Sequence, residues 1–560
     1  MRRLLQNGAS LLTRRQNDIL SAASVIMIIY GLSHLIGLIK TRLLISYFFG
    51  SNAYLLDVYY AAFVIPDTIF QLLIIGSLSA AFIPVFTNLL SSDEKEAWRV
   101  AASSLNLILL IFTFISGVIF VFATPLYRLI APGFNLSQIS IMSSLLRTML
   151  VAQLFFSISG FLTGMIQSHQ RFLIPALAPV AYNLGIVIGT IFLSPTLGIL
   201  GPAIGVVIGA FLHMLIQLPL AVSLGFKFKP IIDVSHPKVK EIIRLFPPRA
   251  LALGIDQIEQ FIAVVLTSLL TSGSLSLLNV ARLLYAIPSS VFGVTIGQAA
   301  LPTLSRQSSL KDMDTFRSTL AASVLQVAFL SLPISVLFII LRIPIVRIVF
   351  GASTFPWSAT LLTGKTLAIL AISATFSAVI QLVVRGFYAL HDTRTPLVVG
   401  LVAALFNAVV GIVMVKQFQA GILGIAFAIT TTAILESLTL SFIIEKRLGT
   451  PRPLESIVFK SLFKMIFISF ISGLFLWLPM RLLDQFVFDT TRTLPLIGLT
   501  VITSAIGMGV YLLLSRLFHI QELDTFFGLV KRVWSWRRLL FTSPPPAPSE
   551  PVILPAPDQN

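Results

Sequence analysis

The chain has 560 residues, of which 56% are apolar and only 11% are charged, and its formal net charge is +17. Soluble globular proteins contain about 25% charged residues, so this composition excludes an ordinary soluble domain and indicates a polytopic membrane protein. The absence of cysteine excludes disulfides and thiol chemistry, and the six histidines show no spacing typical of a metal site.

The apolar stretches predict an all-α polytopic membrane protein with about fourteen transmembrane helices. A helix of about 20 apolar residues spans about 30 Å of hydrocarbon and satisfies its own backbone polar groups there. In chain order, the predicted spans are 20–48, 58–88, 100–124, 140–166, 174–194, 199–222, 250–271, 276–303, 318–341, 358–389, 396–416, 420–444, 457–479 and 494–515.

An internal duplication divides the first twelve spans into two halves. IPDTIF from Ile65 returns as IPSSVF from Ile287, and GILGPAIG from Gly198 returns as GILGIAFA from Gly421, with almost the same offset. Six helices in each half keep both halves in one orientation, so we expect two parallel-related six-helix lobes with a cleft between them. The last two spans lie outside the repeat and either line a groove or pack on the second lobe.

These features predict seven segments of the chain. The sequence of the linker between the lobes also predicts its local structure. Prolines in the linker are expected to stop continuous helix, leaving KVKEIIRLF as a short amphipathic surface helix. The segments are a cytoplasmic N-terminal segment (1–19), an N-lobe (20–224), a cytoplasmic linker (225–249), a C-lobe (250–446), two additional spans (447–516), an interfacial amphipathic helix (517–541) and a disordered Pro-rich tail (542–560).

The distribution of basic residues predicts the orientation. Short loops on one side of the predicted spans hold most of the lysine and arginine, which places both termini in the cytoplasm. The first span carries no cleavage site, so we expect it to be retained. The positive charge is then a topology signal and an attraction for anionic membrane lipids, and we expect no nucleic-acid partner.

Ionisable groups within the spans are the candidate functional residues, because a charge in hydrocarbon costs about 3–10 kcal/mol. Lys40 and Arg42 lie only two residues apart, so at most one of them is expected to face a cleft while the other reaches the headgroups. Arg282 has no carboxylate near it in the sequence, which leaves an anionic ligand or the outer headgroups as its partner.

Acidic residues in the predicted spans are further candidate functional groups. Asp256 and Glu259 share a helix face, which favours a bound cation or a carried proton, unless Asp256 is simply hydrated near the helix end. Asp57 is a candidate helix cap, whereas Asp67 follows Pro66 inside an apolar run. No phosphate-binding loop or nucleophile elbow is present in the sequence, so we expect a transporter rather than an enzyme.

Three long segments carry a family resemblance. RGFYALHDTRTPLVVGLVAALFN from Arg385, QRFLIPALAPVAYNLGIVIG from Gln170 and IPSSVFGVTIGQAALPTLSR from Ile287 resemble the MurJ/MviN family of lipid-linked peptidoglycan precursor flippases. That family lies in a superfamily with multidrug and polysaccharide exporters. The resemblance covers about residues 20–515 and implies two six-helix lobes, two extra helices that form a lipid-tail groove, and residence in the bacterial cytoplasmic membrane.

The resemblance also implies a binding site in which cationic residues of a central cavity hold the diphosphate of lipid II, the undecaprenyl-linked precursor. Lys40 and Arg282 match the family's cavity arginines, and Ser33 and Asp57 match polar positions. The substrate-binding candidates are Lys40, Arg282, Ser33, His34, Asp57 and Arg42. His34 and Thr41 stand where the family has a basic and an acidic residue, and the charged cluster of the second span reads FQLLIIG, so altered ligand contacts or coupling are expected.

Some members of that family hold a sodium ion. The matching candidates here are Asp256, Asn407, Thr430 and Thr431. The resemblance therefore implies no organic cofactor, with coupling to a sodium ion or to the membrane potential.

The leading hypothesis is a flippase that moves lipid II, or a related undecaprenyl-diphosphate glycolipid, from the inner to the outer leaflet by alternating access. One alternative is an exporter of another polyprenyl-linked glycan or of amphiphilic drugs. Another is a non-transporting membrane scaffold that recruits cell-wall synthesis proteins through its Pro-rich tail.

Overall fold

The computed structural model describes residues 19–50, 52–75, 82–351, 354–449, 452–490, 492–524 and 526–528. Within these ranges, the side chains of 19–28, 30, 245–256 and 452–458 are not described. The described residues form helices joined by short connections, and no strand occurs among them. The predicted all-α class is therefore confirmed.

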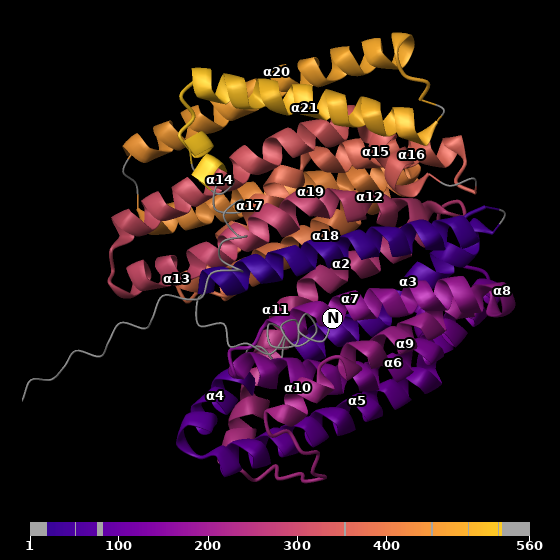
Figure 1. Cartoon of the computed structure of the whole chain (residues 1–560), viewed down its shortest axis with the longest axis vertical. Helices are drawn as coiled ribbons and strands as arrows, with labels where there is room; N and C mark the ends of the chain where they lie inside the picture. Colours follow the sequence, from indigo (N-terminus) through magenta and orange to yellow (C-terminus); the bar gives the residue numbers. More distant parts are fainter. Residues whose placement is uncertain are drawn as a thin grey trace, which may run out of the picture.

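The N-lobe consists of α2 (Ile19–Phe48), α3 (Ala53–Ile69), the π-helical η1 (Phe70–Ile75), α4 (Ile83–Ser92), α5 (Glu94–Ile130), α6 (Leu136–Ser168), α7 (Leu173–Ile188), η3 (Gly189–Leu193), α8 (Ser194–Leu197), α9 (Leu200–Leu215) and α10 (Leu218–Ser223). It packs around α6, which contacts α3, α5 and α9, while α5 lies at the outer edge of the lobe (Figure 1).

The C-lobe follows in the same order, and two further helices come after it. Its elements are α11 (Pro237–Ser268), α12 (Ser274–Pro288), the π-helical η4 (Ser289–Val294), α13 (Thr295–Ser309), α14 (Met313–Ile340), α15 (Arg342–Phe350), α16 (Trp357–Ile372), α17 (Ala374–Ala389), α18 (Arg394–Lys416) and α19 (Gly421–Leu448). The two further helices are α20 (Arg452–Phe486) and α21 (Thr493–Leu517).

The duplicated sequences adopt the same local structure in both lobes. Pro66 lies in the last turn of α3, before η1 begins at Phe70, and Pro288 directly precedes η4, so each copy of the IPxxxF motif contains a change from α-helix to π-helix. A proline has no N–H to donate and displaces the preceding turn, which favours such a widened turn. Gly198 and Gly421 both adopt left-handed φ angles, of 55° and 56°, where the chain enters α9 and α19.

Membrane-spanning character is clear for most of the predicted spans. Eleven helices in the described part of the chain are long and apolar enough to cross a membrane, or twelve if the bent pair α16 and α17 forms one span. The remaining two predicted spans coincide with α2 and α11, which contain residues whose side chains are not described. The count of fourteen stays a prediction.

The connection between the lobes differs from the predicted one. Pro237 occupies the first turn of α11, where its missing N–H costs nothing, and the His236 side chain accepts a hydrogen bond from the Lys238 N–H. The helix then continues through Pro247 and Pro248 to Ser268, so the expectation of a separate surface helix that ends at these prolines was wrong. Membrane helices tolerate proline where neighbouring groups satisfy the freed carbonyls.

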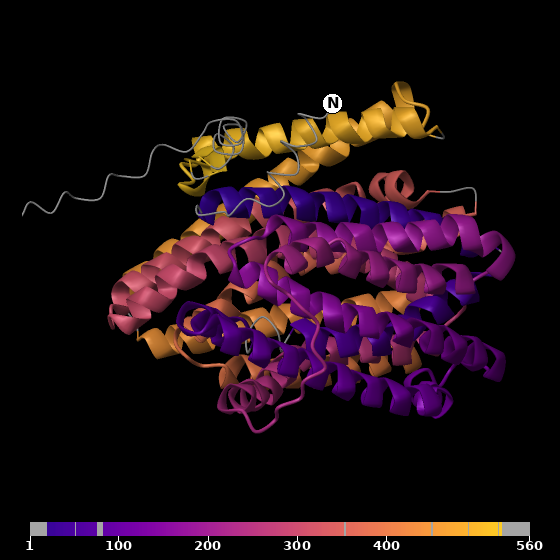
Figure 2. The same cartoon turned by 60° about the horizontal axis from the view of Figure 1, so that its bottom comes forward.

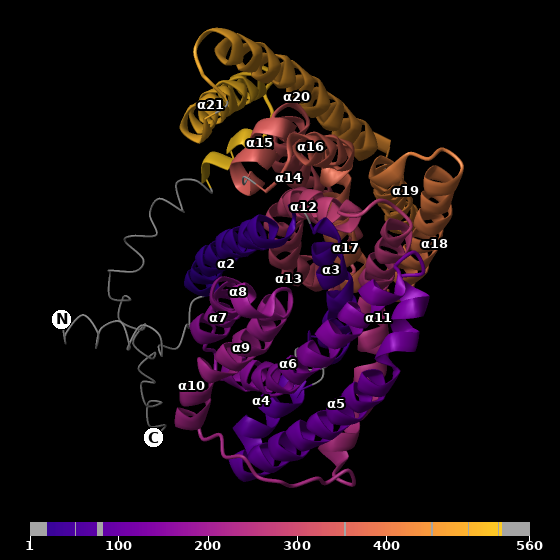
Figure 3. The ribbon, with the colours of Figure 1, turned by 90° about the vertical axis from the view of Figure 1, so that its right-hand side faces the viewer.

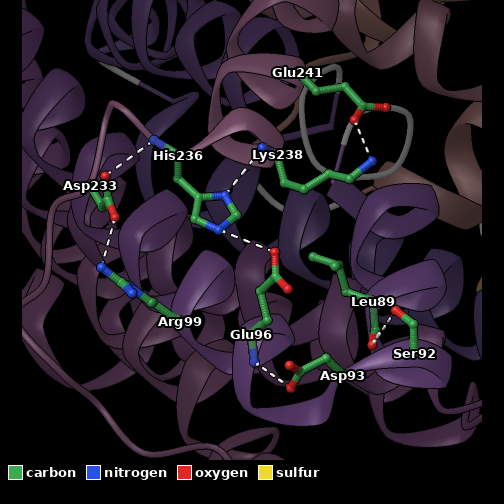
Figure 4. Close-up of polar contacts among 9 residues, drawn as sticks. All are labelled: Leu89, Ser92, Asp93, Glu96, Arg99, Asp233, His236, Lys238 and Glu241. Carbon is green, nitrogen blue, oxygen red and sulfur yellow. Dashed lines mark hydrogen bonds and ion pairs between the residues drawn. The ribbon is translucent and has the colours of Figure 1, made fainter.

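Polar contacts attach the linker and the start of α11 to α5 of the N-lobe (Figure 4). The Asp233 carboxylate lies 3.0 Å from the Arg99 guanidinium, and the His236 Nε2 lies 3.2 Å from the Glu96 carboxylate. The Asn106 amide donates to the carbonyls of Lys229, at 2.6 Å, and Ile231, at 2.9 Å. Because α11 continues into the C-lobe, where it packs against α12 and α18, this helix belongs to both lobes (Figure 3).

The last two helices lie along the outside of the C-lobe, as Figures 1 and 2 show. α20 packs on α14, and α21 packs on α20 and α15. The Tyr511 hydroxyl of α21 donates to the Phe329 carbonyl of α14 at 2.8 Å, which fixes the pair to the lobe. They are additions to the repeat, as predicted. Most of the predicted interfacial helix (517–541), the tail (542–560) and the N-terminal segment through residue 18 lie outside the described residues.

Glycines allow the closest helix contact in the N-lobe. A Cβ added at Gly185 of α7 would lie 2.2 Å from the Gly209 Cα of α9, and one at Gly189 would lie 2.4 Å from the Gly205 Cα. Small residues four apart on both helices let backbones approach in a membrane, where packing rather than the hydrophobic effect drives association.

Gly185→Ala tests this packing. We expect it to destabilise the protein by about 1–3 kcal/mol, because the added methyl group meets backbone atoms that cannot move aside. The matched control is Gly117→Ala on α5, where an added Cβ has no atom within 4 Å. Thermal unfolding in detergent should show a lower midpoint for Gly185→Ala only. Equal midpoints for the two variants would contradict the packing argument.

Candidate functional site

A cavity of about 540 Å³ lies between the lobes. Its wall includes residues of α2 and α3 from the N-lobe and of α11, α12 and α17 from the C-lobe. Figure 3 shows α2, α3 and α12 lying together at this boundary. The polar residues that line it are Lys40, Tyr59, Tyr60, Asp67, Glu259, Gln260, Asn279, Arg282 and Gln381. The predicted cleft between the lobes is therefore present and polar.

Lys40 supplies the cation of the N-lobe side. Its Nζ donates a hydrogen bond of 3.1 Å to the Asn183 side-chain oxygen on α7. The Asn183 amide lies 3.4 Å from both the Ser33 hydroxyl and the Ser33 carbonyl, so Ser33 supports the asparagine that positions the lysine. Asn183 therefore joins α7 to α2 through hydrogen bonds. Ser33 itself is buried and does not line the cavity.

Asp67 faces the same lysine from α3. The two side chains interact electrostatically, and Gln71 of η1 and Gln260 of α11 hydrogen-bond to the carboxylate. Gln260 belongs to the C-lobe, so Asp67 also connects the two lobes. The sequence held a signal for this residue, since an acid directly after a proline inside an apolar run needs a polar partner.

Arg282 supplies the cation of the C-lobe side. Its guanidinium lies 3.9 Å from the Glu259 carboxylate, so the expectation that no carboxylate accompanies it was wrong. The turn between α11 and α12 brings the two residues together although they are distant in the sequence. At 3.9 Å the pair is an ion pair without a close hydrogen bond, which leaves N–H donors of the guanidinium available to a ligand.

Arg42 points to a different place from Lys40. It donates to the carbonyls of Ile348, at 2.9 Å, and Gly351, at 3.0 Å, at the C-terminal end of α15. A cation at this end of a helix is favoured by the helix dipole. The prediction that at most one of Lys40 and Arg42 faces the cleft is confirmed, and Arg42 as a ligand of the cavity is not supported in this conformation. His34 is exposed and does not line the cavity either.

Asp57 caps a helix of the opposite lobe rather than its own. Its buried carboxylate accepts hydrogen bonds from the Gly273 N–H at 2.6 Å, the Ser276 N–H at 2.8 Å and the Ser276 hydroxyl at 2.6 Å. These donors form the N-terminus of α12, which favours a negative charge. The Asp57 carboxylate already accepts three hydrogen bonds and lies outside the cavity wall. Its role in this structure is therefore to join the lobes and not to bind a ligand in the cavity.

A third contact joins the lobes near these two. The Thr354 hydroxyl donates to the carbonyls of Ile45, at 3.3 Å, and Ser46, at 3.2 Å, at the end of α2. By the predicted topology, the end of α2 and the start of α12 lie at the extracellular side. Arg42, Asp57 and Thr354 therefore hold the lobes together at the predicted extracellular end.

The sodium candidates lie on three helices. Asn407 is buried in α18, and the Thr430 hydroxyl of α19 donates to the Ile369 carbonyl at 2.9 Å. The Thr431 hydroxyl donates to the Phe427 carbonyl of its own helix at 2.9 Å. Asp256 lies in α11, but its side chain is outside the described residues. The sodium site stays a prediction.

Asp57→Ala tests the extracellular contact. The substitution removes an acceptor from two buried N–H groups, each of which costs about 1–3 kcal/mol when unsatisfied, so we expect the lobes to separate more readily there. Asn52→Cys and Ser272→Cys provide a cross-linking pair without background, because the chain has no native cysteine. Cross-linking by a short bis-maleimide should fall in Asp57→Ala and stay unchanged in the control Asp484→Ala, whose side chain is exposed. An unchanged yield in both would refute the contact's role.

Comparison with known proteins agrees with this architecture. A family model described as lipid II flippase MurJ matches residues 45–495. The probable lipid II flippase MurJ of Thermotoga maritima is 27% identical over 494 residues, covering 88% of this chain and 95% of the relative. The lipid II flippase MurJ of Burkholderia cenocepacia is 26% identical over 436 residues, covering 74% of this chain and 82% of the relative.

Solved structures share the fold. A lipid II flippase MurJ in an inward closed conformation gives a TM-score of 0.74 at 24% identity and covers 88% of this chain and 98% of its own. An inward-facing multidrug resistance transporter of the MATE family, in the MOP superfamily, gives 0.65 at 16% identity over 78% of this chain and 99% of its own. Because the family model covers most of the chain, the chain belongs to the lipid II flippase MurJ family.

Proposed function

We propose that this chain moves lipid II from the inner to the outer leaflet of the bacterial cytoplasmic membrane, with both termini in the cytoplasm. The observation that carries the proposal is the cavity between the lobes, into which Lys40 projects from one lobe and Arg282 from the other. A diphosphate is very costly to place in hydrocarbon, and cationic side chains in a polar cavity remove that cost. Family membership supports the same substrate.

The donor geometry suits a diphosphate. The Lys40 ammonium has three N–H donors, one of which is used by Asn183, and the Arg282 guanidinium offers a planar fork for two phosphate oxygens. A ligand held by both residues would bridge the lobes. Its prenyl tail would remain among the lipids while the headgroup occupies the cavity.

Alternating access then requires the extracellular contacts to break. In this conformation Asp57 and Arg42 hold helix ends of the opposite lobe, so the outer ends of the lobes are joined. Release to the outer leaflet requires these hydrogen bonds to open while the cytoplasmic ends of the lobes approach each other. We propose that a sodium ion or the membrane potential biases this exchange.

Lys40→Ala combined with Arg282→Ala should abolish transport, because each charge-assisted hydrogen bond contributes about 1.5–3 kcal/mol, or about 10–100-fold. The assay is rescue of a bacterium depleted of its own precursor flippase, scored by the appearance of labelled lipid II at the outer surface. Lys365→Ala is the matched control, since this lysine is exposed on α16 and outside the cavity wall. Normal transport by the double variant, at wild-type abundance in the membrane, would overturn the proposal.

The acidic residues of the cavity suggest a rival function, export of cationic amphiphilic drugs. Asp67 and Glu259 also suit a cationic amphiphile, and a multidrug transporter shares the fold. A drug exporter would protect the same cells against amphiphilic cations and would fail to rescue lipid II export. The scaffold alternative is separated by deleting residues 542–560, because a scaffold should lose activity and a flippase should keep it.

A further inference from the structure

Among the described residues, the cavity wall contains two cationic and two anionic side chains. Lys40 and Asp67 come from the N-lobe, and Arg282 and Glu259 come from the C-lobe. Each lobe therefore brings one cation together with its own carboxylate. With all four groups ionised, their formal charges cancel before any ligand enters.

Each of the two carboxylates has a cation and a tyrosine among its described neighbours. The titratable or charged groups that act on Asp67 are Lys40 on α2 and Tyr182 on α7, with neutral contacts from Gln71 and Gln260. Among the described residues, Arg282 and Tyr285 on α12 act on Glu259. In each case the cation beside the carboxylate is one of the two proposed diphosphate ligands.

A diphosphodiester changes this balance. It brings two negative charges, so the four side chains and the ligand together would carry a net charge of two negative units. Like charges in a partly buried site repel strongly and disfavour the ionised carboxylate. Adding one proton to each carboxylate leaves two cations facing two phosphate charges, and the site is neutral again.

We propose that Asp67 and Glu259 are resident counter-ions of the cavity cations, and that a diphosphate takes their place while the carboxylates take up protons from water. Each carboxylate becomes a neutral carboxylic acid, and the proton returns to water when the ligand leaves. The loaded cavity then carries the same formal charge as the empty one. This inference rests on the proposed binding of a diphosphate between Lys40 and Arg282.

Proton uptake can be measured directly on the full-length protein in nanodiscs. The probe is farnesyl-diphospho-N-acetylglucosamine, a prenyl diphosphodiester chosen because its phosphates do not titrate near neutral pH. Calorimetric titrations in two buffers of different ionisation enthalpy count the protons bound with it. We expect net uptake of up to two protons, and binding that is about tenfold or more tighter at pH 6 than at pH 8, because each linked proton changes affinity by up to about tenfold per pH unit.

Variants separate the two carboxylates from other titrating groups. Asp67→Asn combined with Glu259→Gln should bind the probe more tightly than the wild type at pH 8 and lose the pH dependence. Asp314→Asn, an exposed acid in the first turn of α14, should behave as the wild type. A carboxylate pair with a purely structural role would instead weaken binding at both pH values in the double variant.

The outcomes distinguish this inference from the proposed function. Tight probe binding by the wild type without proton uptake, and with equal affinity at pH 6 and pH 8, would overturn the counter-ion role and leave the proposed function standing. Absence of probe binding at both pH values, with the protein intact by size-exclusion chromatography, would overturn both.

Discussion

The cost of placing a charge among apolar helices is the constraint on which the rest of this structure depends. Four described charged side chains at the lobe boundary each have a specific partner from another helix. Lys40 hydrogen-bonds to Asn183 and interacts electrostatically with Asp67, and Arg282 forms an ion pair with Glu259. Arg42 donates to carbonyl groups at the end of α15, and Asp57 accepts from the N-terminus of α12. Such pairing is what allows ionised groups to exist in a bundle whose outer surface is apolar.

This constraint explains why the general fold could be predicted from the sequence. The length of the apolar stretches predicts the membrane helices, and the repeated IPxxxF and GILG segments predict the two lobes. Both repeats reappear as structure, in the π-helical turns after Pro66 and Pro288 and in the left-handed Gly198 and Gly421. These are local properties of the backbone, which sequence determines directly. The linker was mispredicted because Pro247 and Pro248 weaken helix locally, while the continuation of α11 depends on its tertiary surroundings.

The site could be predicted only in part, for a physical reason. The free-energy cost of burying a charge identifies which residues need a polar partner. By this criterion the sequence analysis selected Lys40, Arg282, Asp57 and Arg42. The criterion does not identify the partner. Glu259 reaches Arg282 only through the turn between α11 and α12, and Asp57 reaches Gly273 only across the lobe boundary. Distinguishing a ligand-binding cation from a helix-capping one therefore required the relative placement of helices.

The extracellular contacts and the cavity are carried by the same helices. α2 carries Arg42 and Lys40, α3 carries Asp57 and Asp67, and α12 carries Ser276 and Arg282. Ser276 and Arg282 are separated by about 9 Å along a continuous helix, at 1.5 Å per residue. Because a helix moves as a rigid element over such a distance, opening the Asp57 contact also moves Arg282 relative to Lys40. A diphosphate that bridges these two cations stabilises the joined lobes, so its release and the opening of the extracellular end are energetically coupled.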